Sequence, residues 1–215
     1  RDGIVRLVGS EMCIRDRVEV LRRDWGGRPA WVAGSTHEGE DELVLFAHHQ
    51  VLEHFPDALL ILVPRHPERF ERVGSLCKRE RLRMARRSRS GEYDRDTQVY
   101  LGDTMGELPV MLGSADVAFI GGSLVPTGGH NMLEAAAQGV AVCFGPHVFN
   151  FATISRMLIE EGAAVQVESE SALAGQVVAW FEDASARAEV GENGRRVVAQ
   201  NRGALQRLID LMPLR

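Results

Sequence analysis

The chain has 215 residues, 45% of them hydrophobic, which is enough to bury the core of one large domain or two small ones. Its net charge of −5 excludes an overall basic balance, so the composition gives no indication of a nucleic-acid partner. Three widely spaced cysteines, Cys13, Cys77 and Cys143, favour neither a disulfide framework nor a zinc site, and no apolar run reaches the roughly 18 residues of a membrane span.

The first seventeen positions, RDGIVRLVGSEMCIRDR, precede the part of the chain in which a regular pattern begins. This stretch resembles a translated cloning or assembly artefact. An edge strand at GIVRLVG is the alternative interpretation. We expect residues 1–17 to be a non-native or disordered leader, residues 18–215 to form the folded domain, and the whole chain to be a piece of a longer protein.

From residue 29 onwards, short apolar segments alternate with longer amphipathic ones. Strands are predicted at residues 29–35, 58–63, 97–103, 116–122, 141–145 and 163–167. Helices are predicted at residues 40–55, 67–82, 104–115, 130–139, 150–162, 170–183 and 184–212. Strands that alternate with helices in this way indicate βαβ units. The sequence therefore predicts an α/β fold, a Rossmann-like doubly wound parallel sheet with helices on both faces.

A basic stretch, KRERLRMARRSRS, occupies residues 78–90. We expect it to end one helix and to continue as a solvated loop. Contact with an anionic partner or surface is the alternative.

Polar or glycine-rich turns follow one predicted strand after another, at residues 34–38, 64–67, 103–107, 121–131 and 145–150. The carboxyl ends of parallel strands meet at one edge of the sheet, and open α/β sheets bind their ligands there. The sequence therefore predicts a ligand site at this edge, which we call the rim.

The richest of these turns is GGSLVPTGGHNMLEAAAQG, residues 121–139. Gly128 and Gly129 stand where the predicted helix begins, so a phosphate can approach the N–H groups of its first turn. His130 and Asn131 add donors, and Glu134 can accept two hydrogen bonds from a ribose diol. These features predict a nucleotide site, although the spacing matches neither GxGxxG nor GxxxxGK[ST]. The alternative is a glycine-rich turn with an Asn131 cap and a solvated Glu134.

Residues 121–151 resemble the donor-binding core of bacterial 3-deoxy-D-manno-octulosonic acid (Kdo) transferases, which add Kdo to the lipid A precursor. The blocks WVAGSTHEGEDE, LLILVPRHPERF and VYLGDTMGEL are similar to other blocks of that family, in the same order. The resemblance covers residues 28 to about 210. It implies the C-terminal, donor-binding domain of a GT-B glycosyltransferase, with the N-terminal acceptor domain missing.

The resemblance also implies which residues contact the donor. It places the cytidine nucleotide at Pro64, Arg65, Met105, Gly106, Glu107, Asn131, Met132, Leu133 and Glu134. It places the phosphate loop and a cleft-facing turn, which we expect to be exposed, at Gly34, Ser35, Thr36, Gly128, Gly129 and His130. Met132 and Ala135 stand where the family often has proline, a departure that bears on how the donor sugar fits.

On this resemblance, the complete enzyme is an inverting, metal-independent glycosyltransferase that moves Kdo from CMP-Kdo to the lipid A precursor in lipopolysaccharide biosynthesis. The general base, the acceptor site and the surface that meets the cytoplasmic face of the bacterial inner membrane would belong to the missing half. The fragment itself would be soluble, without cofactor, metal or nucleic-acid partner, and inactive alone. A UDP-sugar epimerase-like GT-B protein and a non-catalytic nucleotide-binding domain are the alternatives.

Overall fold

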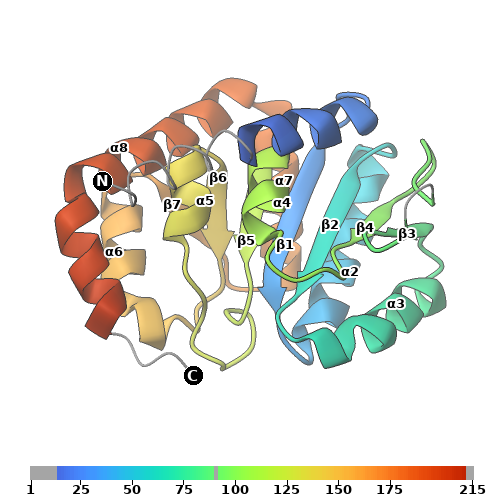
Figure 1. Ribbon diagram of the computed structural model, residues 1–215, viewed down its shortest axis with the longest axis horizontal. Coiled ribbons are helices and arrows are strands. Elements are labelled where there is room, and N and C mark those ends of the chain that lie inside the picture. The colour runs from blue at the N-terminus through green and yellow to red at the C-terminus, as the bar shows by residue number, and fades with distance from the viewer. Residues whose placement is uncertain (1–13, 90–91, 212–215) are drawn as a thin grey trace, which may run out of the picture.

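The computed structural model describes residues 14–89 and 92–211. Its strands form one parallel sheet in the order β3-β4-β2-β1-β5-β6-β7 (Figure 1). The strands are β1 (Ala30–Thr36), β2 (Leu59–Pro64), β3 (Met84–Arg86), β4 (Val99–Leu101), β5 (Val117–Ile120), β6 (Ala141–Phe144) and β7 (Ala164–Gln166). The helices are α2 (Glu40–His54), α3 (Phe70–Arg79), α4 (Leu108–Ser114), α5 (Leu133–Gln138), α6 (Ala152–Glu160), α7 (Glu170–Glu182) and α8 (Ala184–Leu211), preceded by a helix over residues 14–24.

The central strands are apolar because both faces of the sheet are covered. LLILVP in β2, VAFI in β5 and AVCF in β6 are buried along their whole length. From β1 the chain first builds β2, β4 and β3 on one side, and then returns to place β5, β6 and β7 on the other. The predicted doubly wound Rossmann-like fold is confirmed, and the order reverses between β1 and β5, where such sheets bind ligands.

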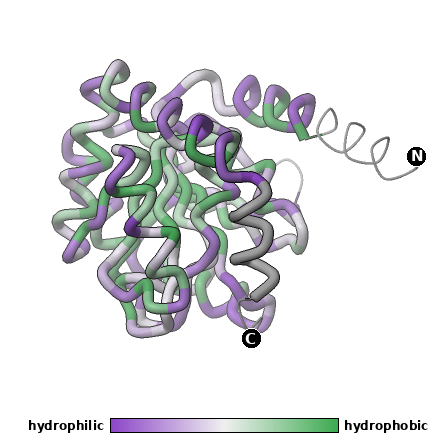
Figure 2. Tube along the Cα trace, turned by 90° about the vertical axis from the view of Figure 1, so that its left-hand side faces the viewer, coloured by the Kyte–Doolittle hydropathy of each residue, from purple (hydrophilic) through white to green (hydrophobic). Residues whose placement is uncertain are grey.

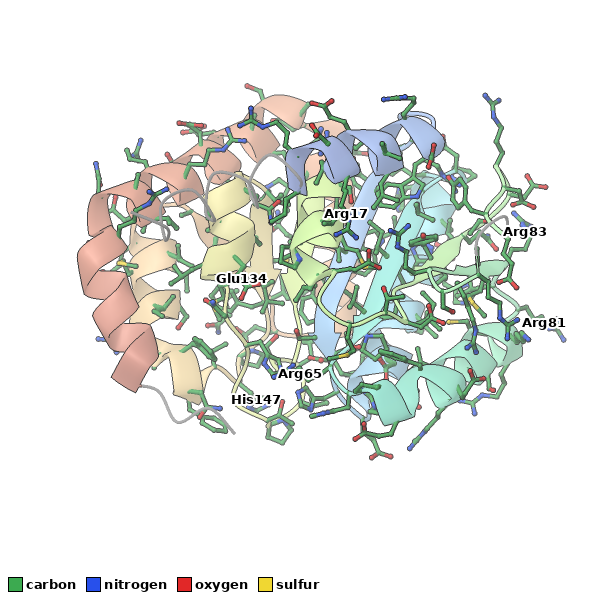
Figure 3. All side chains as sticks on the ribbon, in the orientation of Figure 1. Arg17, Arg65, Arg81, Arg83, Glu134 and His147 are labelled. Carbon is green, nitrogen blue, oxygen red and sulfur yellow. The ribbon has the colours of Figure 1, made fainter. Side chains whose placement is uncertain are left out.

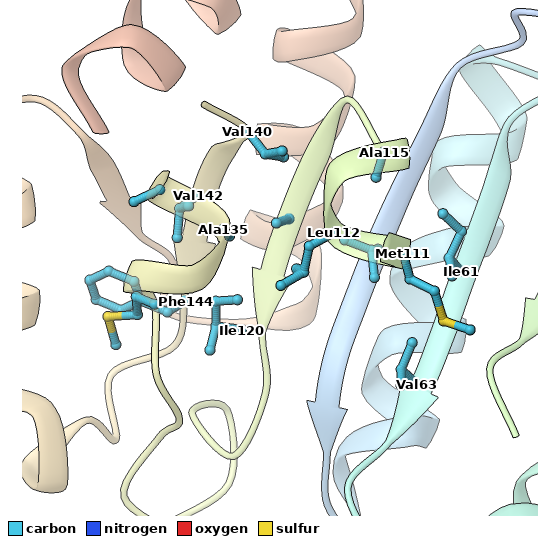
Figure 4. Close-up of a cluster of buried hydrophobic side chains, with 14 of the residues drawn as sticks. Ile61, Val63, Met111, Leu112, Ala115, Ile120, Ala135, Val140, Val142 and Phe144 are labelled. Carbon is cyan, nitrogen blue, oxygen red and sulfur yellow. The ribbon is translucent and has the colours of Figure 1, made fainter. Parts of the chain in front are cut away.

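Two hydrophobic clusters lie on opposite faces of the sheet. On one face, Met111 and Leu112 of α4 and Ala135 of α5 pack with side chains such as Phe144 (Figure 4). On the other face, the cluster draws on α2, α3 and α7. Hydrophobic residues accordingly fill the interior of the chain trace, and hydrophilic residues lie on its outer turns (Figure 2).

The basic stretch at residues 78–90 is not simply a solvated loop. Met84–Arg86 form β3 at the edge of the sheet, beside β4. The side chain of Arg86 is buried, donates to Glu71, and lies 3.6 Å from a carboxylate oxygen of Asp103. This guanidinium attaches the edge strand β3 to α3 through its bond to Glu71. The prediction of a solvated loop was therefore wrong for Met84–Arg86.

The expected boundary between residues 17 and 18 lies inside the helix over residues 14–24. Ile14 and Val18 both pack against the first hydrophobic cluster. Residues 1–13, which carry most of the expected leader and the alternative strand GIVRLVG, lie outside the described residues. Within residues 14–89 and 92–211, no helix has the length and apolar character needed to cross a membrane.

Candidate functional site

The end of β1 forms the centre of the rim and contains a backbone irregularity. The pairing of β1 with β2 shifts register between Gly34 and Thr36, and Ser35 between them adopts a φ of 59°. A positive φ is unfavourable for a residue other than glycine, and such strain is common at functional sites. Gly34 and Thr36 are buried, and the Thr36 hydroxyl donates to Asp41 at 2.6 Å. The expectation that this whole turn is exposed was therefore wrong, and only Ser35 and His37 are partly accessible.

A buried carboxylate, Glu40, organises the glycine-rich loop after β5. It lies at the start of α2 and accepts hydrogen bonds from the backbone N–H groups of Gly122 at 2.6 Å, Ser123 at 3.0 Å and Leu124 at 2.9 Å. It also accepts from the N–H of His37 at 3.2 Å. These amides therefore already bind an internal anion. The sequence analysis missed Glu40, whose only signal was its place among three acids in the first turn of a helix.

The start of α5 differs from the sequence prediction. The helix begins at Leu133, and not directly after Gly129. Gly128 and Gly129 have φ values of 100° and 78°, which a right-handed helix cannot contain. The side chain of Asn131 accepts from the N–H of Leu133 at 3.1 Å, and the N–H of Gly129 donates to Gly122 at 2.7 Å. A phosphate at Gly128–Gly129 would therefore not lie at the helix terminus that we expected.

Three imidazoles meet at the rim from three different strand ends. His37 follows β1, His66 follows β2 and His130 lies in the loop after β5. The Nε2 atoms of His37 and His130 are 2.6 Å apart, and the two ring planes are nearly parallel, with an interplanar angle of 12° and their centroids 4.9 Å apart. His66 lies edge-on to His37, with a centroid distance of 5.4 Å. This cluster brings together loops that the sequence placed at the rim only one by one.

Two of these imidazoles, those of His37 and His130, have a lowered pKa and are uncharged at neutral pH. Burial, and then the neighbouring His37, Arg65 and His66, lower the pKa of His130 to about 4. Burial, followed by the charges of His66, Arg69 and Arg65, also lowers the pKa of His37. Protonation of His37 and His130 is thus disfavoured at this point of the rim.

Arg65 supplies the exposed cation of the rim. It directly follows the buried Pro64 at the end of β2, and its backbone N–H donates to Thr36 at 3.0 Å. Arg65 and His147 both lie at the edge of the sheet where the strands end (Figure 3). The charge of the Arg65 guanidinium helps to lower the pKa of His37 and of His130, so Arg65 belongs to the same cluster. The predicted position of Arg65 at the rim agrees with the structure.

The loop after β4 carries the second predicted contact strip. Met105 is 63% exposed and Gly106 has a φ of 76°, so both lie on the surface. Glu107 instead accepts two hydrogen bonds from Arg87, at 2.9 and 3.0 Å, and further bonds from Thr104 and Arg17. The carboxylate of Glu107 thus joins this loop to the segment after β3 and to the helix over residues 14–24. A direct role in nucleotide binding stays a prediction for these three residues.

The third strip divides into buried and exposed parts. Met132 and Leu133 are buried in the first hydrophobic cluster, so their side chains pack in the core and only their backbone could meet a ligand. Glu134 is exposed on α5 (Figure 3), and Asn131 donates to it at 3.3 Å. The helix has Met132 as its N-cap and no side-chain cap, so the alternative with an Asn131 cap was wrong, although the side chain of Asn131 accepts from the N–H of Leu133. The carboxylate of Glu134 is accessible, and ribose binding there stays a prediction.

A hollow of about 520 Å³ lies next to the rim, beyond the end of β6. Its lining consists of Pro146, His147, Val148, Phe149, Ala152, Ser155, Arg156, Ile159, Glu160 and Gln166. The N–H of His147 donates to Ser123 at 2.9 Å, which joins this lining to the loop after β5. Within residues 14–89 and 92–211, no group of three or more His, Cys, Asp or Glu side chains has an arrangement that could hold a metal ion.

Comparison with known proteins shows to which family the chain belongs. No protein-family model matches the chain. It is 33% identical to the C-terminal CMP-Kdo binding domain of WaaA from Acinetobacter baumannii, whose crystal structure superposes with a TM-score of 0.83 over 87% of this chain and 98% of that domain. The chain belongs to the Kdo transferase family. The fold is accordingly that of the C-terminal domain of a GT-B glycosyltransferase.

Curated Kdo transferases agree with this assignment. The enzyme from Haemophilus influenzae is 48% identical over 198 residues, which are 91% of this chain and 46% of that protein. The enzyme from Bordetella pertussis is 37% identical over 190 residues, which are 86% of this chain and 44% of that protein. The chain therefore spans about half the length of the Kdo transferases it matches. The family assignment confirms the resemblance and argues against the epimerase-like alternative.

Proposed function

We propose that this chain is the donor-binding part of a Kdo transferase and that it binds CMP-Kdo at the rim between β1 and β5. The observation that carries the proposal is the match to almost the whole of a domain described as binding CMP-Kdo. The predicted contacts at residues 64–65, 105–107 and 131–134 follow β2, β4 and β5, whose carboxyl ends share one edge of the sheet. This is the position at which doubly wound sheets bind nucleotides.

In this proposal, the chain stabilises the departing CMP. Negative charge grows on the phosphate as the bond to the sugar breaks, and fixed donors near that charge lower the barrier. Arg65 offers a planar fork of donors suited to a phosphate. Glu134, exposed on α5, would accept from the ribose diol. We propose that no metal or other cofactor takes part, because these cationic and polar groups can take up the charge of a phosphate leaving group.

Acceptor binding, deprotonation of the acceptor and membrane contact require a complete transferase in this proposal. We propose that the lipid A precursor, the general base and the contact with the cytoplasmic face of the bacterial inner membrane all involve the part of the Kdo transferases that this chain does not span. Catalysis needs donor and acceptor held together, and positioning supplies much of the rate. We therefore expect the 215-residue chain to bind the donor and to transfer nothing on its own.

Calorimetric titration with CMP and UMP tests the proposal. The chain should prefer CMP, and Arg65→Ala should weaken binding by about 1.5–3 kcal/mol through the loss of a charge-assisted hydrogen bond. Arg79→Ala, which removes an exposed arginine at the end of α3, is the matched control and should bind normally. Equal affinity for the two nucleotides, or an unchanged Arg65→Ala variant, would contradict the proposed site.

A second variant tests the ribose contact. Glu134→Gln keeps the size of the side chain and removes its charge, so cytidine binding should weaken while the melting temperature stays within about two degrees. A large loss of stability with intact binding would show that Glu134 has a structural role.

A further inference from the structure

We propose that His37 and His130 form a phosphate-binding pair that takes up one proton when the phosphodiester of the donor binds. This inference rests on the proposed function and identifies the group that meets the phosphate. The two rings lie at the reversal point of the sheet, between the loops after β1 and β5, and meet through their Nε2 atoms. In the same loop as Gly128 and Gly129, which the sequence suggested for a phosphate, the amides of Gly122 to Leu124 are bound to Glu40, and the N–H of Gly129 donates to Gly122.

The short contact between the rings limits which protons they can carry. Two Nε2 atoms 2.6 Å apart need one N–H donor and one lone pair between them. In the neutral pair, one ring is protonated at Nε2 and the other at Nδ1. One added proton leaves the Nε2–H···Nε2 bond intact and places an N–H on both Nδ1 atoms. A second added proton would set two N–H groups against each other. The pair therefore accepts one proton, and with it becomes a cation with two Nδ1 donors.

In the part of the chain that the structure describes, neither ring of the pair forms an ion pair with a carboxylate. From the loop after β2, the cations Arg65 and Arg69 and the third imidazole, His66, all oppose protonation. Three carboxylates of the rim have other partners: Glu40 accepts from backbone amides, Asp41 from Thr36 and Arg69, and Glu38 from Arg72. Glu134 on α5 is exposed and accepts from Asn131. An anionic ligand at the rim would supply the charge that the protonated pair needs.

The sign of the pH dependence follows from this linkage. In the protein without ligand, burial lowers the pKa of His130 to about 4, so the pair is neutral at pH 7. A bound phosphodiester favours the charged form and raises that pKa. Affinity must then increase as the pH falls through the pKa of the complex, and it must level off near the pKa of the unliganded protein.

The methyl ester of CMP is the appropriate probe. It is a phosphodiester like the donor, and its phosphate keeps one negative charge between about pH 5 and 8, so a pH dependence belongs to the protein. Calorimetry in two buffers with different ionisation enthalpies measures the protons taken up on binding. We expect close to one proton per nucleotide at about pH 5.5, and a Kd about tenfold lower there than at about pH 7.5.

Variants of the 215-residue chain assign the proton. His130→Gln and His37→Gln should each abolish proton uptake and flatten the pH dependence of Kd. His54→Gln, which changes an exposed imidazole at the far end of α2, should leave both unchanged. Binding by the unaltered chain without proton uptake would overturn the pair and leave the proposed function standing. Failure of that chain to bind the probe at any pH would overturn both. If a pair variant does not fold, the two-buffer measurement on the unaltered chain still decides.

Discussion

The protein holds imidazoles with lowered pKa values in two different settings, one buried and one half-buried. His48, in the middle of α2, accepts from the indole N–H of Trp31 at 3.1 Å and lies 2.9 Å from the carbonyl oxygen of Gln98. Because the indole can only donate and the carbonyl can only accept, the ring must be neutral and protonated at Nε2. At the rim, His37 and His130 instead use each other as partners.

The difference between the two settings shows what a lowered pKa means. Burial lowers the pKa of His48 to about 3 and that of His130 to about 4, so the shift alone does not separate them. Their partners do separate them. The partners of His48 cannot change their charge, so that ring is part of the core. The partner of His130 is itself titratable, so the rim keeps a position open for a proton.

Removal of His48 should have the largest effect. His48→Ala leaves a cavity and removes the hydrogen-bond partner of the buried Trp31 indole N–H, so the free energy of unfolding should fall by about 3 kcal/mol. Urea denaturation at about pH 7.5 measures this loss. The adjacent His49 is exposed, and His49→Ala should change stability by less than about 0.5 kcal/mol. Similar losses in the two variants would show that the bonds of His48 are not structural.

The carboxylate of Glu40 accepts hydrogen bonds from four backbone N–H groups at the rim. Its neutralisation should have the next largest effect on the free energy of unfolding. Glu40→Gln replaces an acceptor of several N–H groups by an amide that must set an NH₂ against some of them, so stability should fall by about 2 kcal/mol. Glu42→Gln, an exposed change in the same helical turn, is the control for the helix dipole. Thermal unfolding of both variants checks the prediction, and equal losses would contradict the anchoring role of Glu40.

Much of the fold followed from the sequence, because its signals are local. The apolar runs of β2, β5 and β6 have no other favourable place than a buried parallel sheet, and each lies where the pattern predicted a strand. β3 was missed because it has three residues, MAR, within an arginine-rich stretch. Its burial depends on Glu71 and Asp103, which only the tertiary structure brings near.

The site could be predicted only in outline. The strand ends gave the rim, and with it Arg65 and the exposed Glu134. The pairing of His37 with His130 joins residues 93 apart in the chain, and Glu40 reaches amides 82 to 84 residues away. No local pattern shows which of three successive acids turns inward. Met132 and Leu133 show the converse, since a motif match cannot tell a side chain in the core from one at the ligand.

The dependence of stability on pH should sharpen the comparison of the two imidazole sites. A lowered pKa gives stability that is complete above the unfolded value of 6.5 and is lost as the pH falls towards the folded value. His48 and His130 should each contribute a slope of up to about 1.4 kcal/mol per pH unit. Burial raises the pKa of Asp41 to about 6, although the hydrogen bond from Thr36 and the charge of Arg69 lower it. The contribution of Asp41 to stability therefore increases as the pH falls, opposite to that of the two imidazoles.

A difference measurement removes the contribution of Asp41, which is present in both proteins. His130→Gln should lose about 1 kcal/mol less than the unaltered chain between about pH 6.5 and 5, because one half-buried imidazole no longer has to stay uncharged. Urea denaturation at several pH values measures the two slopes. Parallel slopes would mean that His130 is not held neutral by the fold.

Relief of the strained backbone at Ser35 should have the smallest effect on the free energy of unfolding. It allows the end of β1 at the rim to be compared with the regular part of the same strand. Ser35→Gly relieves a positive φ of 59° but increases the entropy of the unfolded chain, so the two terms should cancel to within about 0.5 kcal/mol. Ala33→Gly, two residues earlier in the regular part of β1, has only the entropic cost and the loss of a buried methyl group, and should destabilise by about 1–2 kcal/mol. Denaturation of the two variants side by side gives the comparison. Equal losses would mean that the backbone at Ser35 is relaxed. The expected difference would show that the regular part of β1 is more sensitive to a loss of packing than its end at the rim, where strain lies beside the proposed donor site.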